Sequence, residues 1–303
     1  VSTIDFADQI RLPVVHNMKL PSYDNVLCDE AQDFSTLQGL LVSAISGNRY
    51  VFVGDCHQSI YGFRGVMNNS MQVLKDMFNC QELPLSITYR CASSIAKEAY
   101  NIFPDIEAWE DNPAGVVRVG DCDKEQYDSN TIVLCRLNRP LIKLAFSLLN
   151  RGIPCYVKGR DIGEGLVKII NKQEAVDVRQ LIDRLEQWYE LEVQKAVVRE
   201  DDSKLTSLSD KYESLMVFVS KCQLNDSSQV VVDSINRMFM EGKGVCLSTV
   251  HKAKGLEAEK CYVLEHGLHD YFTNRVRQQW QKEQERNIKY VAVTRGKSEL
   301  VYM

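Results

Sequence analysis

Two strings of acids and amides follow short apolar runs and could carry phosphate chemistry. Asp29-Glu30-Ala31-Gln32-Asp33 comes directly after the apolar run 24–28. An acid at the carboxyl end of a parallel strand lies where α/β proteins bind ligands. Such an acid can hold Mg²⁺ on a nucleotide, and a neighbouring acid can orient the attacking water. A bare Asp-Glu pair is more often a solvated turn that caps the next helix, but the complete five-residue string is far more specific.

The second string, residues 53–65, follows another apolar run and combines an amide with aromatic and basic side chains. Gln58 could hydrogen-bond a terminal phosphate. Tyr61, Phe63 and Arg64 interleave aromatic faces with a cation, a combination that suits stacking on single-stranded bases. The competing interpretation is a loop whose aromatic side chains fill a core.

Apolar runs of strand length alternate with helical patterns along most of the chain, which predicts α/β domains with parallel sheets. The predicted strands are 24–28, 50–53, 116–119, 131–135, 245–249, 261–264 and 299–302, and the predicted helices between them are 34–46, 67–78, 92–103 and 139–150. Residues 173–200 contain no Gly or Pro and carry apolar residues at helical spacing, and 208–219 and 229–240 are also predicted to be helical. The region 166–240 is therefore predicted to be an all-helical insertion.

Composition excludes several classes of protein. The chain has 303 residues, a net charge of −5 and 25% charged residues, which argues against a wholly basic histone-like binder and against disorder. No apolar run approaches the ~20 residues that span a bilayer, so no membrane association is expected. The ten cysteines include no CxxC pair, so we expect no zinc site, and reduced thiols in a cytoplasmic compartment.

The two strings resemble motifs II and III of superfamily 1 helicases of the UvrD/Rep/PcrA type. The rest of the chain extends the resemblance in the family's order, with likenesses to motif IV at 85–91, motif V at 245–257 and motif VI at 290–295. Residues 132–136 and 151–154 are similar to the segment that starts the family's second core domain. Residues 4–8 resemble the element upstream of motif II, and their continuation into Leu12-Pro13 is similar to phage-type members.

The resemblance implies a fold and a domain organisation. The expected fold is an α/β, RecA-like parallel-sheet P-loop NTPase core with an all-helical insertion. We expect residues 1–82 to be the C-terminal part of the first core domain, 83–165 and 241–303 to be the two segments of the second, and 166–240 to be a reduced accessory subdomain.

The resemblance also implies roles for single residues. Asp29 would hold Mg²⁺, Glu30 would activate the water, Gln58 would contact the γ-phosphate of ATP, and Arg90 and Arg295 would be arginine fingers from the second core domain. The residues implied to bind the rest of the nucleotide are Tyr89, which would stack on adenine, Glu257, which would bond the ribose, and Gly255. The residues implied to face nucleic acid are Tyr61, Phe63, Arg64, Thr249, His251 and Lys252.

One motif that the family needs does not occur in the sequence. A phosphate loop, G-x-x-x-x-G-K-[ST], should precede motif II, but none of the 28 residues before Asp29 is a glycine. The Gly-Lys-Ser at 296–298 has Val291 where the first glycine should be. We expect the chain to be a fragment of a longer protein; the alternative is a natural member that has lost the loop or receives it from another polypeptide. Either way, residues 1–303 alone are predicted to hydrolyse ATP weakly or not at all.

The predicted function is that of an ATP-dependent DNA helicase or translocase that moves 3′→5′ along single-stranded DNA. The partners would be single-stranded and duplex DNA together with replication or repair proteins of a bacterial or phage-infected cell. The alternative is a non-catalytic module that binds single-stranded nucleic acid with a helicase-like core. A nuclease fusion ranks last, because no cluster of acids and lysines follows Arg295.

Overall fold

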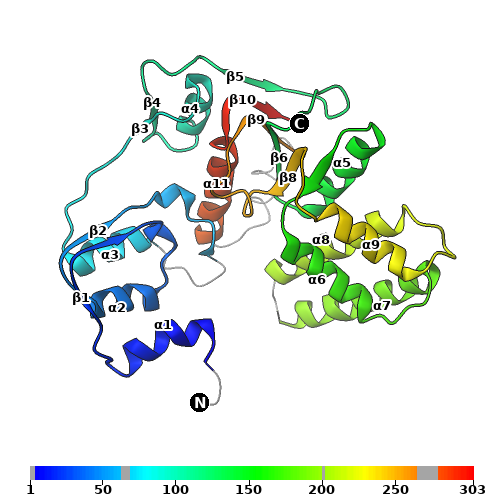
Figure 1. The fold of residues 1–303 in the computed structure, drawn as a ribbon, viewed down its shortest axis with the longest axis horizontal. Helices are drawn as coiled ribbons and strands as arrows, with labels where there is room; N and C mark the ends of the chain where they lie inside the picture. Colours follow the sequence, from blue (N-terminus) through cyan, green and yellow to red (C-terminus); the bar gives the residue numbers. More distant parts are fainter. Residues whose placement is uncertain (1–3, 63–68, 200–201, 265–278) are drawn as a thin grey trace. The chain divides into compact units, whose positions relative to one another are not determined.

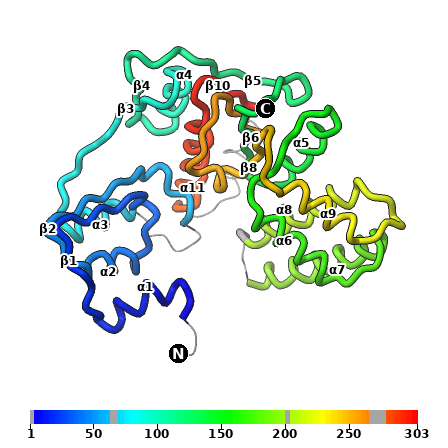
Figure 2. The backbone as a smooth tube through the Cα atoms, in the orientation of Figure 1, coloured from blue at the N-terminus to red at the C-terminus, as the bar shows by residue number. Residues whose placement is uncertain are grey.

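The computed structural model describes residues 4–62, 69–199, 202–264 and 279–303 (Figure 1). The chain divides into two compact units. Unit 1 consists of Val1–Thr88, Ala99–Glu107 and His269–Val291, and unit 2 consists of Tyr89–Glu98, Ala108–Leu268 and Ala292–Met303. Each unit therefore contains segments that are distant in sequence, which Figure 2 allows the reader to trace by colour.

Unit 1 is built on a two-stranded parallel sheet with short helices after each strand. Its elements are α1 (Phe6–Val15), β1 (Ser22–Cys28), η1 (Ala31–Asp33), α2 (Thr36–Ala44), β2 (Ser46–Phe52), η2 (Cys56–Gln58), α3 (Ser70–Phe78) and β3 (Ile87–Thr88). The sequence specifies two helix starts directly, because Asp5 with Asp8 and Ser35 with Gln38 form capping boxes at α1 and α2. The helix α11 (Gln279–Val293) contributes to unit 1 as far as Val291.

The two strands of unit 1 are largely exposed, which is unusual for strands of a parallel sheet. Leu27 is 75% exposed, Val53, directly after β2, is 51% exposed, and Tyr23 is also exposed. Parallel sheets normally have both faces covered. Only two strands pair in this sheet among the described residues, so the side chains on β1 and β2 have few neighbours to pack against.

Unit 2 is built on a six-stranded parallel sheet, which confirms the predicted α/β fold class. The strand order is β5-β10-β9-β6-β8-β7, and each neighbouring pair is parallel. The strands are β5 (Val116–Val119), β6 (Thr131–Cys135), β7 (Cys155–Val157), β8 (Val245–Thr249), β9 (Ala258–Val263) and β10 (Gly296–Tyr302). Every residue of β6 is buried, as the apolar run predicts for a central strand. A parallel sheet covered by helices is consistent with a RecA-like helicase core.

Helices account for most of the remainder of unit 2. They are α4 (Ser93–Tyr100), which belongs to unit 2 as far as Glu98, and α5 (Asn138–Asn150), α6 (Arg160–Asn171), α7 (Val178–Val198), α8 (Asp202–Val219) and α9 (Ser228–Met238). The short strand β4 (Glu107–Ala108) lies at a boundary between the two units. The stretch from α6 to α9 is helical, as expected for the predicted insertion, and it begins at Arg160. No helix in the described part of the chain is both long and apolar enough to cross a membrane.

One buried carboxylate ties the helical stretch to the core sheet's helix α5. Asp210 of α8 is 8% exposed and accepts hydrogen bonds from the backbone N–H groups of Asn138 and Arg139, each at 3.0 Å. Its second oxygen accepts from the Asn138 side-chain amide at 2.8 Å. The first N–H groups of a helix have no partner within the helix, so Asp210 acts as the cap of α5 from a separate element.

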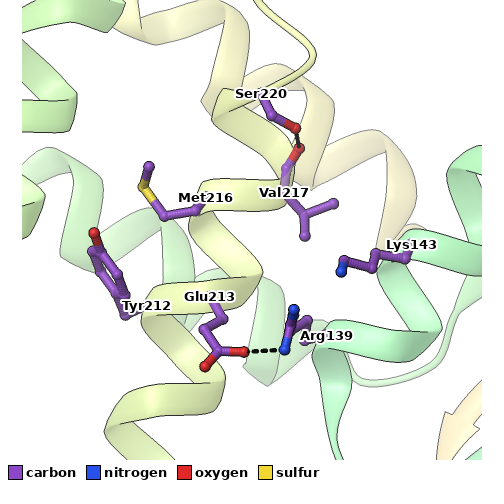
Figure 3. Close-up of a pocket in the computed structure, with 7 residues that line it drawn as sticks. All are labelled: Arg139, Lys143, Tyr212, Glu213, Met216, Val217 and Ser220. Carbon is purple, nitrogen blue, oxygen red and sulfur yellow. Dashed lines mark hydrogen bonds and ion pairs between the residues drawn. The ribbon is translucent and has the colours of Figure 1, made fainter.

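A pocket of about 250 Å³ lies between the same two helices (Figure 3). Arg139 and Lys143 of α5 face α8, where Glu213 forms an ion pair with Arg139 at 2.5 Å. None of the residues that line the pocket was predicted as a site residue. The pocket therefore belongs to the packing of α8 against α5 rather than to the predicted chemistry.

Candidate nucleotide and nucleic-acid sites

In unit 1 the parallel pairing of β1 with β2 brings the two predicted strings together. The N–H of Val53 donates to the carbonyl of Cys28 at 2.8 Å, and the N–H of Ala31 donates to the carbonyl of Val53 at 2.9 Å. The acids that follow β1 and the loop that follows β2 consequently lie at the same edge of the sheet, as the strand-end argument predicts.

Gln32 is the residue that joins the two strings. It is 2% exposed, its side-chain amide donates to Glu30 Oε2 at 2.6 Å, and its Oε1 accepts from the N–H of Asp55 at 3.2 Å. Sequence analysis placed Gln32 within the motif but gave it no role. Its position shows that it orients Glu30 relative to the start of the second string.

The two acids after β1 are exposed and held by local geometry. Glu30 adopts a left-handed backbone with φ 51°, and its N–H donates to Asp29 Oδ1 at 2.8 Å. Gln58 donates from its amide to Asp55 Oδ2 at 2.8 Å, so it lies in the same loop in a fixed orientation. Mg²⁺ on a nucleotide is usually held by only one or two carboxylates together with the phosphates, and the exposed carboxylate of Asp29 fits that requirement.

Gly54 lies where the second string packs closely against Gln32 of the first string, and a larger residue would not fit there. A Cβ at this position would lie 2.3 Å from Gln32 Oε1 and 3.0 Å from the Gln32 backbone nitrogen. We expect Gly54→Ala to lower the free energy of unfolding by about 1–3 kcal/mol, as overpacking does in other tight sites. The measurement is chemical denaturation of both variants against wild type. The control is Gly165→Ala in α6, where no atom lies within 4 Å of the added methyl group, and equal stability of the two variants would contradict the prediction.

The second string is also anchored by parts of unit 1 that are distant in sequence. The His57 ring stacks on Phe103 with centroids 3.6 Å apart, and its Nε2 lies 2.7 Å from Asp105 Oδ2. Burial opposes the charged ring, but the hydrogen bonds with Cys56 and Asp105 outweigh it and raise the pKa of His57 to about 9. The imidazolium is therefore the expected form at neutral pH.

Helix α11 holds the continuation of this loop. The amide of Asn287 donates to the carbonyl of Ser59 at 2.8 Å, and the amide of Gln284 donates to the carbonyl of Ile60 at 2.7 Å. These contacts fix the backbone up to Tyr61, which is half-buried. The predicted residues Phe63 and Arg64 lie outside the described residues.

In unit 2 the paired starts of β9 and β10 form the amino edge of the sheet. Glu257 directly precedes β9 and Arg295 directly precedes β10. Arg295 is 2% exposed, and its guanidinium donates to the carbonyl of Leu256 at 3.2 Å and to the hydroxyl of Thr294 at 3.4 Å. Burial, followed by the nearby positive charge of Arg90, lowers the pKa of Arg295.

Glu257 is shared by two cations at this edge. Its Oε1 lies 2.6 Å from Lys297 Nζ and its Oε2 lies 3.1 Å from Arg90 Nε. The hydrogen bond with Lys297 is the largest cause of the lowered pKa of Glu257. We call Arg90, Glu257, Arg295 and Lys297 the amino-edge cluster. Three cations and one carboxylate leave an excess of positive charge, which suits a polyphosphate.

Tyr89 and Gly255 flank the amino-edge cluster in sequence. The Tyr89 ring is 69% exposed and packs against Trp109 with centroids 5.5 Å apart. An exposed ring held by a second aromatic side chain offers a face on which a flat base can stack. Gly255 has φ +84°, a conformation that favours glycine, so it allows the turn that precedes Glu257.

The predicted nucleic-acid residues of motif V lie at the opposite edge of the same sheet. Thr249 is the last residue of β8, and His251 and Lys252 lie two and three residues further along the chain. We call these three residues the carboxyl-edge group. Strands β8 and β9 are both parallel to β6, so the chain that leaves the end of β8 must return to the other edge of the sheet before β9 begins. The five residues of β8 separate the two edges by about 16 Å. Motif V therefore runs from one edge to the other.

Two family models match the chain, and they match its two ends. The model of the UvrD/REP helicase N-terminal domain matches residues 11–79, and the model of the UvrD-like helicase C-terminal domain matches residues 167–303. The chain belongs to the UvrD-like helicase family. This membership confirms the resemblance to superfamily 1 that motifs II to VI indicate.

Curated proteins similar to this UvrD-like chain carry helicase names. The F-box DNA helicase protein 1 of Schizosaccharomyces pombe is 25% identical over 321 aligned residues, which cover 96% of the chain and 35% of that protein. DNA helicase II of Salmonella typhimurium is 36% identical over 80 residues, 25% of the chain and 11% of that protein. The ATP-dependent DNA helicase srs2 of S. pombe is 40% identical over 81 residues, 26% of the chain and 9% of that protein. The chain spans about a third or less of each of these relatives.

The structure groups the predicted site residues of this UvrD-like chain into three sets. One set follows β1 and β2 in unit 1, and the amino-edge cluster and the carboxyl-edge group lie on unit 2. Sequence analysis missed Gln32 and Lys297. A signal for Lys297 was present, because it lies two residues after Arg295 of motif VI.

Proposed function

We propose that this UvrD-like chain is part of an ATP-dependent DNA helicase that moves 3′→5′ along single-stranded DNA. The observation that supports the proposal is the separation of two polar sets on one sheet. A cationic cluster suited to polyphosphate precedes β9 and β10, and the residues proposed to touch DNA follow β8. Motif V connects the two sets in sequence, so a conformational change at one edge of the sheet could be transmitted to the other edge through this segment.

The proposal assigns nucleotide chemistry to residues of each unit. In unit 1, Asp29 would hold Mg²⁺, and the ion would supply positive charge to the phosphates; Glu30 would orient the attacking water, and Gln58 would contact the γ-phosphate. In unit 2, Arg90 and Arg295 meet the negative charge that spreads over the phosphate oxygens in the transition state. Tyr89 stacks on the adenine and Glu257 bonds the ribose, while Gly255 contributes the turn that precedes Glu257.

The proposal assigns DNA contacts to the carboxyl-edge group and to the second string. Thr249 and His251 offer hydrogen bonds to the strand, and Lys252 pairs with a phosphate. The aromatic and basic residues of the second string stack on successive bases. These are Tyr61, Phe63 and Arg64. Duplex DNA and proteins of replication or repair are the proposed partners.

The second candidate is a non-catalytic module that binds single-stranded nucleic acid. One observation favours it: the 303 residues contain no G-x-x-x-x-G-K-[ST] string, so they offer no backbone cradle for the β- and γ-phosphates. The two candidates differ in whether ATP is hydrolysed once such a loop is supplied.

The test compares two forms of the protein. One is the 303-residue chain alone. The other, which we call the loop-containing form, is the chain together with a phosphate loop, either on the same polypeptide or on a second one. We expect residues 1–303 alone to bind single-stranded DNA with weak or no ATP turnover. The loop-containing form should show DNA-stimulated turnover that Glu30→Gln abolishes. DNA binding without turnover in both forms would support the non-catalytic module. DNA-stimulated turnover by residues 1–303 alone would contradict the assignment of phosphate binding to the loop.

A further inference from the structure

Lys252, the cation of the carboxyl-edge group, is paired with an acid that has no assigned role. Lys252 Nζ lies 2.7 Å from Asp161 Oδ2. The pairing follows from the sheet order: β7 and β8 are parallel neighbours, so both end at the same edge. The N–H of Lys158 donates to the carbonyl of Leu247 at 2.8 Å, which extends the pairing to the residue that follows β7. The start of α6 consequently lies beside the loop that follows β8.

Asp161 is held as an anion by its position in α6. It lies in the first turn of that helix, where the helix dipole favours negative charge. The hydrogen bond with Lys252 is the largest cause of the lowered pKa of Asp161, and the backbone N–H groups of Asp161 and Ile162 lower it further. The acid is therefore charged at neutral pH whether or not Lys252 stays with it.

The pair is open to solvent and so to a nucleic-acid phosphate. The side chain of Asp161 is 67% exposed and that of Lys252 is 34% exposed. A phosphate that takes Lys252 must displace the Asp161 carboxylate and then remain near its negative charge. Both effects oppose binding, and both depend on ionic strength.

We propose that Asp161 competes with the DNA phosphate for Lys252 and thereby limits the affinity of this chain for single-stranded DNA. The inference depends on the proposed function, because it takes the carboxyl-edge group as a DNA contact. Affinity limited in this way lets the strand be released, which a protein that moves along DNA requires at each step. Asp161 is a residue that tunes Lys252 rather than a contact to DNA.

The test is fluorescence anisotropy of a labelled oligo-dT titrated with the 303-residue chain, at salt concentrations from about 50 to 200 mM. Asp161→Asn should tighten binding by about threefold to fivefold at the lowest salt, the range expected for freeing one exposed ion pair. It should also steepen the dependence of log K on log salt by up to about 0.7, the value for one added phosphate contact on a single strand.

Glu164→Gln is the matched control, because it removes the same charge from the same helix. Glu164 pairs with Arg160 at 3.1 Å and not with motif V. It should leave the affinity near that of wild type. If Asp161→Asn and Glu164→Gln tighten DNA binding equally, the net charge of the protein explains the effect, and the inference is overturned.

A double variant separates failure of the inference from failure of the proposed function. Lys252→Ala should weaken binding, and adding Asp161→Asn to Lys252→Ala should produce no further change. If Lys252→Ala weakens binding but Asp161→Asn has no effect, only the competition is refuted. If Lys252→Ala leaves the affinity unchanged, the proposed DNA contact itself is wrong. Thermal unfolding of each variant checks that the fold is retained.

Discussion

Replacing Arg90 by alanine is expected to lower ATP turnover by the loop-containing form by about three to five orders of magnitude, the effect of removing an arginine finger. The Arg90 guanidinium lies in the amino-edge cluster, with its Nε 3.1 Å from Glu257 Oε2. Single-stranded DNA affinity should stay unchanged, because the carboxyl-edge group lies at the other edge of the sheet. The measurement is steady-state ATP hydrolysis with saturating DNA, together with DNA anisotropy.

Arg90 is a better probe than Arg295, the other predicted finger. Arg295 is 2% exposed and donates to the carbonyl of Leu256, so its loss would disturb the fold as well as the chemistry. The side chain of Arg90 is 45% exposed. When Arg90 is removed, Glu257 still has its ion pair with Lys297. Arg90→Lys should restore only part of the turnover, because an ammonium cannot bond a phosphate bidentately.

The control for Arg90 is Arg160→Ala, another arginine of unit 2. Its side chain is 87% exposed and pairs with Glu164 within α6. Turnover near the wild-type value is expected for Arg160→Ala. If Arg90→Ala also keeps near-wild-type turnover, Arg90 does not meet the transferred phosphate.

Replacing Asp210 by alanine is expected to lower the free energy of unfolding of the chain by about 2–3 kcal/mol. The carboxylate is buried and caps α5, so its loss leaves the N–H groups of Asn138 and Arg139 without that partner. In a domain of this size the midpoint of thermal unfolding should fall by about 4–10 °C. The measurement is chemical denaturation combined with thermal scanning.

Asp210→Asn and Asp183→Asn serve as controls for this prediction. Asn keeps one side-chain oxygen as an acceptor, so Asp210→Asn should cost less stability than Asp210→Ala. Asp183 lies exposed on α7, and its substitution should leave the stability near that of wild type. An Asp210→Ala chain as stable as Asp183→Asn would show that the cap contributes little to the link between α8 and α5.

Local patterns predicted the main strands and helices because those elements carry strong signals. The apolar run 131–135 became the buried central strand β6, and the Gly- and Pro-free stretch after 173 became α7. Elements without a pattern were missed. The strand β7 has only three residues, too few for a period, and α6 contains two glycines that weaken a helical prediction.

The sequence predicted those parts of the site whose residues belong to a motif and follow the end of a strand. Asp29 and Gln58 follow adjacent parallel strands, and strand order then brings their loops together. Pairs between distant segments were not predictable. Asp161 and Lys252 are 91 residues apart, and only the pairing of β7 with β8 brings them together. The exact limits of the predicted domains and the roles of single site residues remain predictions.

The central claim is that, within unit 2, the residues proposed for nucleotide chemistry and those proposed for DNA binding lie at opposite edges of one sheet. The most direct test is a single-stranded DNA titration of ATP turnover by the loop-containing form, which yields a plateau rate and a DNA midpoint from one curve. Arg90→Ala should lower the plateau without moving the midpoint, and Lys252→Ala should move the midpoint to higher DNA concentration with the plateau retained. A Lys252→Ala curve that loses its plateau at an unchanged midpoint would contradict the account.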